Sequence, residues 1–151
     1  MDITTLLSKI PFFNTLTPRE RERLAGFNEL FVRYAKDEAV IEENTMGTAF
    51  FVLVHGTVRV VKDIQPDIIL ATLKPGSVFG EMAFLSKTER TTSVRANDET
   101  IVVIKLTEYT LNKMSAEVRE KIKDKLILIL IDRINSMNKT LFERESKDKH
   151  E

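Results

Sequence analysis

The sequence predicts an α+β fold in which an antiparallel β jelly roll or barrel is flanked by short N-terminal helices and one long C-terminal helix. Between Glu29 and Lys105, short runs of β-branched and aromatic residues alternate with turn-forming residues, as in barrels and sandwiches. The segments on either side have helical spacing instead. At 151 residues the chain has the usual size of one domain. We expect helices over 1–28, a barrel over 29–106, C-terminal helices over 107–145 and a flexible tail over 146–151.

Two short helices are predicted before the barrel. Leu7 and Ile10 share one helical face, and Pro11 interrupts that helix. The run 17–20, Thr-Pro-Arg-Glu, supplies an N-cap, a proline at the first helical position and a capping-box acid. Gly26 is expected to end this second helix.

The barrel segment contains seven candidate strands. We expect them over 30–34, 39–41, 49–54, 57–62, 68–73, 92–96 and 100–105. His55-Gly56 is predicted to join two of them as a tight hairpin, and Pro66-Asp67 and Pro75-Gly76 to mark further turns.

A long C-terminal helix follows. Thr107 can cap a short helix that ends near Met114, and Ser115 opens a stretch to Glu145 without Pro or Gly. One face carries the helical spacing Val118, Ile122, Leu126, Ile129, Arg133 and Met137. From 126 to 131 every face is apolar, which requires cover from the barrel and from a second surface. A homodimer through this turn is one way to supply it.

Composition excludes several classes of function. The chain has 23 basic and 23 acidic residues, so no overall field would attract nucleic acid or an anionic membrane surface, and neither is an expected partner. It has no cysteine, which removes disulfides, thiol nucleophiles and Cys-ligated metals and fits a reducing compartment. We expect no signal peptide, and the longest apolar run is six residues, far below the ~20 that a bilayer requires. A cytoplasmic location is expected.

One segment carries chemistry. Gly80 to Leu85 can form a single helical turn whose first amides face outward and favour an anion. Gly80 lets a ligand approach the backbone, and Arg90 offers a planar fork for two phosphate oxygens. Glu81 would repel an anion, so it makes sense only if it accepts a hydrogen bond from a hydroxyl of the same ligand. A phosphate, a neighbouring hydroxyl and an apolar body describe that ligand.

The runs Phe79-Gly-Glu-Met-Ala-Phe-Leu85 and Arg90-Thr-Thr-Ser-Val94 resemble the phosphate-binding cassette of cyclic-nucleotide-binding domains. The resemblance implies a cAMP or cGMP ligand, with Glu81 on the ribose 2′-hydroxyl and Arg90 on the cyclic phosphate. The backbone cradle would come from Gly80, Met82, Ala83, Thr91 and Thr92. The resemblance to the family extends to the N-terminal motif Ile10-Pro-Phe-Phe13 and covers nearly the whole chain.

Two positions depart from the family pattern, and neither removes a named contact. Glu89 stands where the family often has Pro, and Thr92 stands where a small residue is usual. Thr91 is compatible with either base and does not choose between cAMP and cGMP. Family members close a C-terminal helix over the base, which implies lid residues among Leu126, Ile127, Leu130 and Ile134.

Other functions have less support in the residues. His55 and His150 are isolated, so no metal site is expected, and Ser and Thr residues lack the context of a catalytic nucleophile. We therefore expect no enzyme, no catalytic residue and no cofactor beyond the ligand. A separate effector protein would have to receive the signal. The alternative is a ligand-free interaction module that keeps the cassette only as structure.

Overall fold

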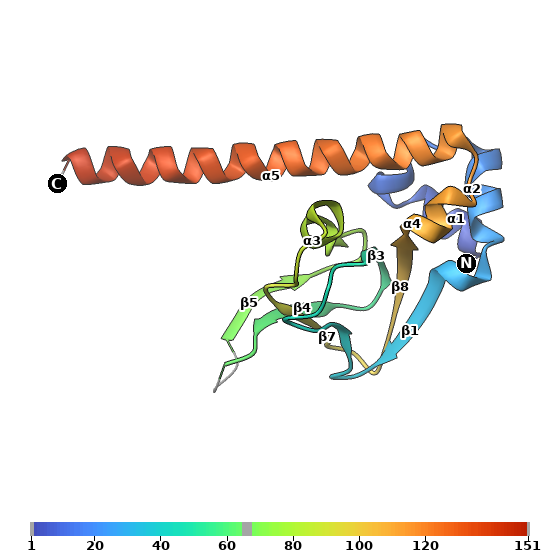
Figure 1. Cartoon of the computed structure of the whole chain (residues 1–151), viewed down its shortest axis with the longest axis horizontal. Coiled ribbons are helices and arrows are strands. Elements are labelled where there is room, and N and C mark those ends of the chain that lie inside the picture. The colour runs from blue at the N-terminus through green and yellow to red at the C-terminus, as the bar shows by residue number, and fades with distance from the viewer. Residues whose placement is uncertain (1, 65–67, 151) are drawn as a thin grey trace.

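The strands form two four-stranded antiparallel sheets, seen in a computed structural model that describes residues 2–64 and 68–150 (Figure 1). One sheet has the order β1-β8-β3-β6 and the other β2-β7-β4-β5. The strands are β1 Phe31–Ala35, β2 Ala39–Ile41, β3 Ala49–His55, β4 Val58–Lys62, β5 Ile68–Leu73, β6 Val78–Phe79, β7 Ser93–Ala96 and β8 Thr100–Thr107. The expected jelly-roll fold is confirmed, as two separate sheets and not as one closed barrel.

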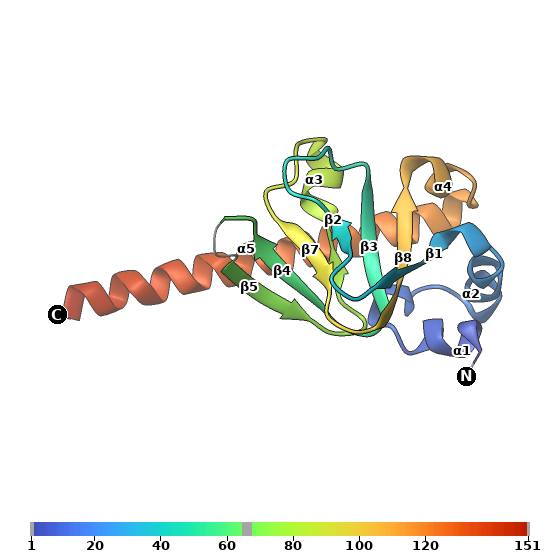
Figure 2. The same ribbon diagram turned by 90° about the horizontal axis from the view of Figure 1, so that it is seen from below.

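The two N-terminal helices and the short helix after β8 gather at one end of this sandwich, and the longest helix starts there and passes beyond the opposite end (Figures 1 and 2). The helices are α1 Ile3–Ser8, α2 Pro18–Ala25, α3 Glu81–Ser86, α4 Glu108–Asn112 and α5 Ala116–His150, with 3-10 turns at η1 Pro11–Phe13 and η2 Asn28–Leu30. The expected capping box is present in α2, where Thr17 Oγ1 accepts from the Glu20 amide and Glu20 accepts from the Thr17 amide.

Two differences from the sequence expectation concern the strands. The hairpin predicted at His55-Gly56 is wrong, because β3 pairs with β8 and β6 and leaves no free edge for β4, which lies in the other sheet. The two-residue strand β6 was not expected, since two residues are too few to show alternation. The turn predicted at Pro66-Asp67 lies outside the described residues.

The core has two parts because β3 is buried on both faces. Phe51 and Leu53 pack between the sheets with residues such as Val103. Phe50 and Val52 point to the opposite face, where they join the helical cluster of Leu7, Phe13, Leu24, Leu111, Ile122 and Leu126. Because successive side chains of β3 point to opposite faces, this strand packs both against the other sheet and against the N- and C-terminal helices.

Helix α5 is docked only over its first part. Val118, Ile122 and Leu126 are buried in the helical cluster, whereas the apolar residues after Leu126 are largely exposed. The helix continues to His150, past residue 145, because this segment is rich in helix formers and contains no Pro or Gly. No helix in the described part of the chain is long and apolar enough to cross a membrane.

The docking of α5 can be tested with two leucines of the same helix. Leu126 is 1% exposed and Leu128 is 54% exposed. Leu126→Ala should lower the free energy of unfolding by about 3 kcal/mol, because it removes a buried side chain and leaves a cavity. Leu128→Ala should lower it by less than about 0.5 kcal/mol. Urea unfolding followed by circular dichroism measures both, and equal losses would contradict the docking.

Candidate ligand-binding site

A cavity of about 600 Å³ lies between α3, the segment after it and the sheet that contains β4 and β7. Its volume is in the range that small-molecule sites occupy. It is lined by all seven residues that the sequence singled out: Gly80, Glu81, Met82, Ala83, Arg90, Thr91 and Thr92. Apolar residues of the sandwich complete the wall, namely Ile41, Val60, Leu73, Phe79 and Val94. The structure therefore places polar groups from two chain segments against an apolar surface.

Gly80 makes the sharp entry into α3. Its φ of 78° is in the left-handed region, and an added Cβ would lie 2.9 Å from Ile41 Cδ1 and 3.0 Å from Arg90 Nη1. The first intrahelical bond is from the Phe84 amide to the Gly80 carbonyl. The amides of the preceding residues 81–83 thus have no helical partner, as at any helix start.

The loop between β2 and β3 holds the cassette from outside. The Arg90 amide donates to the Thr45 carbonyl at 2.7 Å, and the Arg90 carbonyl accepts from the Asn44 amide at 2.9 Å. Gly47 permits this contact, because a Cβ there would lie 2.5 Å from Ala83 Cβ. The backbone of Arg90 is consequently fixed at both of its polar groups.

The Arg90 side chain is a buried cation. It is 7% exposed, and its guanidinium donates to the carbonyl oxygens of Gly80 and Ala49. No carboxylate among the described residues forms an ion pair with it. Burial lowers the pKa of Arg90 below its ordinary value, although an arginine remains charged in such a site. A cation that is matched only by neutral carbonyls attracts an anion.

Glu81 is 1% exposed and forms an ion pair with Arg133 of α5. Its Oε1 is buried and has no hydrogen bond of regular geometry, so the ion pair is what compensates its charge. Arg133 also donates to the Val78 carbonyl at 2.8 Å. Burial lowers the pKa of Arg133 as well. One arginine thus connects α5, β6 and the first residue of α3.

Arg133 lines the cavity although the sequence predicts it only as a member of the apolar stripe of α5. A charged residue at a position where the helical spacing calls for an apolar one was the available signal. Its carboxylate partner could not be identified, because residues 81 and 133 are brought together only by the docking of α5.

The amides of Thr91 and Thr92 remain open. Neither donates a hydrogen bond among those formed by the described residues, and the ladder between β4 and β7 begins at Ser93. Both residues line the cavity. Glu89 lines its rim, where it is exposed and bridges to Met46. The lining of the cavity thus contains residues with open backbone donors together with the Arg90 guanidinium.

The four expected lid residues lie along α5, and none of them is among the residues that line the cavity. Leu126 is 1% exposed and packs in the helical cluster. Ile127 and Ile134 are 53% and 56% exposed, and Leu130 is half-buried. Among the described residues that line the cavity, the one from α5 is Arg133.

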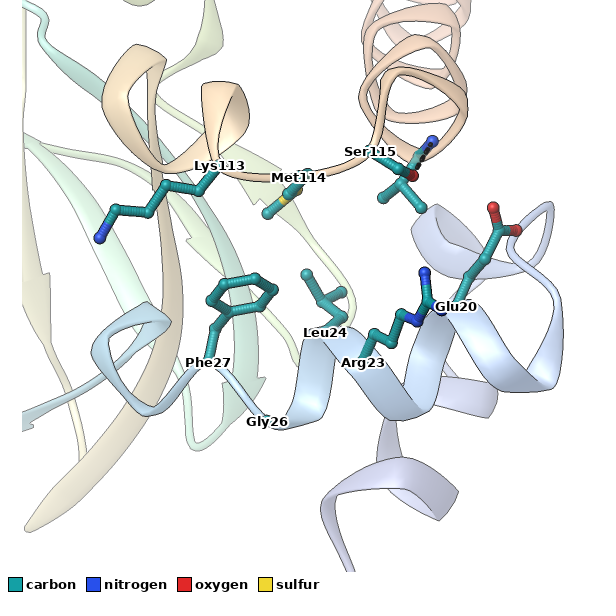
Figure 3. Close-up of a pocket in the computed structure, with 9 residues that line it drawn as sticks. Glu20, Arg23, Leu24, Gly26, Phe27, Lys113, Met114 and Ser115 are labelled. Carbon is teal, nitrogen blue, oxygen red and sulfur yellow. Dashed lines mark hydrogen bonds between the residues drawn. The ribbon is translucent and has the colours of Figure 1, made fainter.

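A second cavity, of about 320 Å³, lies where α2 and α4 meet the start of α5 (Figure 3). Leu24, Phe27 and Met114 face one another across it. Of its charged residues, Lys113 pairs with Glu29 and Glu20 pairs with Lys121, whereas Arg23 is exposed to solvent. It offers apolar surface but no buried polar group for a ligand. Within the described residues, no group of three or more His, Asp or Glu could hold a metal ion.

Comparison with known proteins agrees with this arrangement. A family model described as "Cyclic nucleotide-binding domain" matches residues 31–117. The chain is 30% identical over 113 residues to the cAMP-dependent protein kinase regulatory subunit of Mycosarcoma maydis, covering 72% of this chain and 21% of that protein. It is 31% identical over 94 residues to the cGMP-dependent protein kinase, isozyme 1, of Drosophila melanogaster, covering 60% of this chain and 12% of that protein.

Solved structures show the same fold. The catabolite activator protein of Thermus thermophilus superposes with a TM-score of 0.72 at 24% identity, over 87% of this chain and 61% of that one. The chain spans only about a fifth of the length of the curated regulatory subunit it matches, so the similarity concerns the domain and not the whole relative.

Proposed function

The chain belongs to the cyclic nucleotide-binding domain family, and from this premise we propose that it is a regulatory sensor that binds cAMP or cGMP in the 600 Å³ cavity. The buried guanidinium of Arg90 is the observation that supports this most directly. A phosphate would supply the negative charge that the described residues do not place beside Arg90. The open amides of Ala83, Thr91 and Thr92 would donate hydrogen bonds to its remaining oxygens.

Glu81 is the proposed ribose contact. A buried carboxylate beside an anion site is unfavourable unless a hydroxyl or a cation compensates its charge. In the structure Arg133 compensates it. A 2′-hydroxyl of the same ligand would donate a further hydrogen bond to this carboxylate. The apolar residues Val60 and Leu73 would then face the base.

The choice between the two bases stays open in this proposal. Relatives that are named for cAMP and for cGMP both match the chain. Thr91 is compatible with either ligand. A direct titration with both nucleotides is needed to decide between them.

We also propose that α5 is the moving element. Arg133 ties it to Glu81. Ile127 and Ile134 are exposed, and each could either cover a base or pack against a second copy of the chain, but not both at once. Leu126 would reach the ligand only if α5 left the helical cluster. Leu126 and Leu130 therefore act as lid residues only if α5 changes its position. The ligand can move this equilibrium only by its difference in affinity for the two positions. An effector protein would respond to the position of α5.

The second apolar face of α5 favours a homodimer. Ile127, Ile131, Ile134, Asn138 and Leu141 follow the alternating spacing of four and three residues that pairs helices in a coiled coil. All four apolar members of this stripe are between 46% and 56% exposed. A second copy would cover the stripe, and Asn138 would fix the register of the pair.

The alternative function is that of a ligand-free interaction module. The same exposed stripe would then dock a protein partner, and the cassette would serve only as structure. Calorimetric titration of the nucleotide-free protein with cAMP and cGMP distinguishes the two. Saturable micromolar or tighter binding supports the sensor, and silence toward both nucleotides supports the interaction module.

Arg90→Ala should weaken the binding of whichever nucleotide the wild type prefers by roughly thirtyfold or more. The reason is the loss of a buried charge-assisted pair, which costs about 2–5 kcal/mol. Calorimetry measures the affinity, and circular dichroism checks that the variant is folded, because Arg90 also holds two backbone carbonyls. Arg33→Ala, at an exposed position of β1, is the matched control. An Arg90 variant that is folded and binds normally would contradict the assigned phosphate site.

Glu81→Ala should weaken the cyclic nucleotide more than its 2′-deoxy analogue. The wild type should prefer the ribose form by roughly tenfold, since an unmade hydrogen bond to a buried charge costs about 1.5–3 kcal/mol. The variant should lose that preference. If it weakens both ligands equally, Glu81 does not contact the 2′-hydroxyl.

Ile134→Glu should convert a dimer into a monomer, because it places two like charges in the seam between the helices. Ser136→Glu, on the outer face of the same helix turn, should leave the dimer intact. Sedimentation velocity at about 10–100 μM measures both. A wild-type chain that is monomeric over this range would exclude the homodimer.

A further inference from the structure

We propose that Lys62 is a positioning residue of the cavity, which holds the Thr91 carbonyl from outside and thereby directs the Thr92 amide toward the ligand. The inference rests on the proposed function, because it assigns this amide to a phosphate oxygen. Lys62 belongs to no part of the cassette and does not line the cavity.

The contact itself is well defined. Lys62 is the last residue of β4, and its Nζ donates to the Thr91 carbonyl oxygen at 2.8 Å. The same Nζ lies 2.6 Å from Glu43 Oε1. Thr91 directly follows Arg90, so Lys62 acts on the peptide next to the phosphate-binding side chain.

Peptide geometry converts this contact into a direction. In a planar trans peptide, the carbonyl of one residue and the amide N–H of the next point in opposite directions. With the Thr91 carbonyl fixed toward Lys62, the Thr92 N–H points away from Lys62. That N–H is not engaged by any hydrogen bond of the described residues, and Thr92 lines the cavity. It is therefore available to a ligand oxygen.

The lysine is itself held in place. The Glu43 side chain is 11% exposed, and its Oε2 accepts from the Asp63 amide at 2.9 Å. The Glu43 amide donates to Ser93 Oγ at 2.9 Å, and Ser93, which is fully buried, donates to the Asp63 carboxylate. The hydrogen bond from Lys62 is the main cause that lowers the pKa of Glu43, and the hydrogen bond from the Asp63 backbone lowers it further. Three strand ends thus share one polar network beneath the cassette.

Lys62→Met tests the inference because it keeps the length of the side chain and removes the donor. It should weaken cAMP or cGMP binding by about fivefold, since a half-exposed charged hydrogen bond contributes less than a buried one. Lys62→Arg should restore most of the affinity, because a guanidinium can also donate to a carbonyl. Lys36→Met is the control. Lys36 is exposed in the turn before β2, and this turn contacts Ala96, at the end of β7 that is far from Thr92.

Phosphorothioate analogues separate positioning from general loss of structure. In the Rp and Sp diastereomers a sulfur replaces one or the other exocyclic oxygen, and sulfur is the weaker acceptor. If Lys62 acts through the Thr92 amide, Lys62→Met should cost less for the diastereomer whose sulfur faces that amide. The ratio of the two affinities should therefore change by about threefold between wild type and variant.

Equal weakening of both diastereomers, or normal affinity of Lys62→Met, would overturn the role of Lys62 while leaving the sensor function in place. If the wild type itself binds neither nucleotide, the proposed function fails, and this result is distinct from the first. A change in the affinity ratio together with rescue by arginine supports the assignment.

Discussion

The structure around the cavity depends on the burial of one guanidinium. Arg90 donates to the carbonyls of Gly80 and Ala49, so a single side chain connects the start of α3 with the start of β3. A buried cation is costly unless its donors are satisfied and its charge is compensated. The carbonyls satisfy the donors, but they do not neutralise the charge. The fold therefore keeps an uncompensated positive charge at the position where an anion would bind.

The surrounding backbone is arranged so that this positive charge stays in place. The β2–β3 loop holds both polar groups of the Arg90 backbone, and Gly47 makes that loop close enough to do so. Lys62 holds the next carbonyl. Each of these contacts uses up a backbone group on the outer side of the cassette. The amides that remain open are those along the cavity, which favours a prearranged cradle over one that forms around the ligand.

Much of this could be predicted from the sequence, because the relevant signals are local. Strand alternation, the capping box of α2 and the spacing between Glu81 and Arg90 are all contained in short windows. Arg133 and Lys62 could not be found in that way, since their partners are 52 and 29 residues away and meet them only through the packing of α5 and the pairing of β4 with β7. The false hairpin at His55-Gly56 has the same origin, because a turn signal does not specify which sheet the next strand joins.

Helix α5 links the cavity to the rest of the molecule through residues of two kinds. Leu126 and the residues before it anchor the helix in the helical cluster, whereas Arg133, two turns later, reaches the carboxylate of Glu81. Any ligand group that changes the hydrogen bonding of Glu81 therefore changes the free energy of the contact made by the middle of α5, while the first turns of the helix stay anchored. Linkage is reciprocal: if the ligand changes the affinity of a partner for the exposed stripe of α5, the partner changes the affinity for the ligand by the same factor. Because Arg133 lies within the segment 127–141 that carries the stripe, on one continuous helix, dimerisation and nucleotide binding would be thermodynamically coupled in this chain.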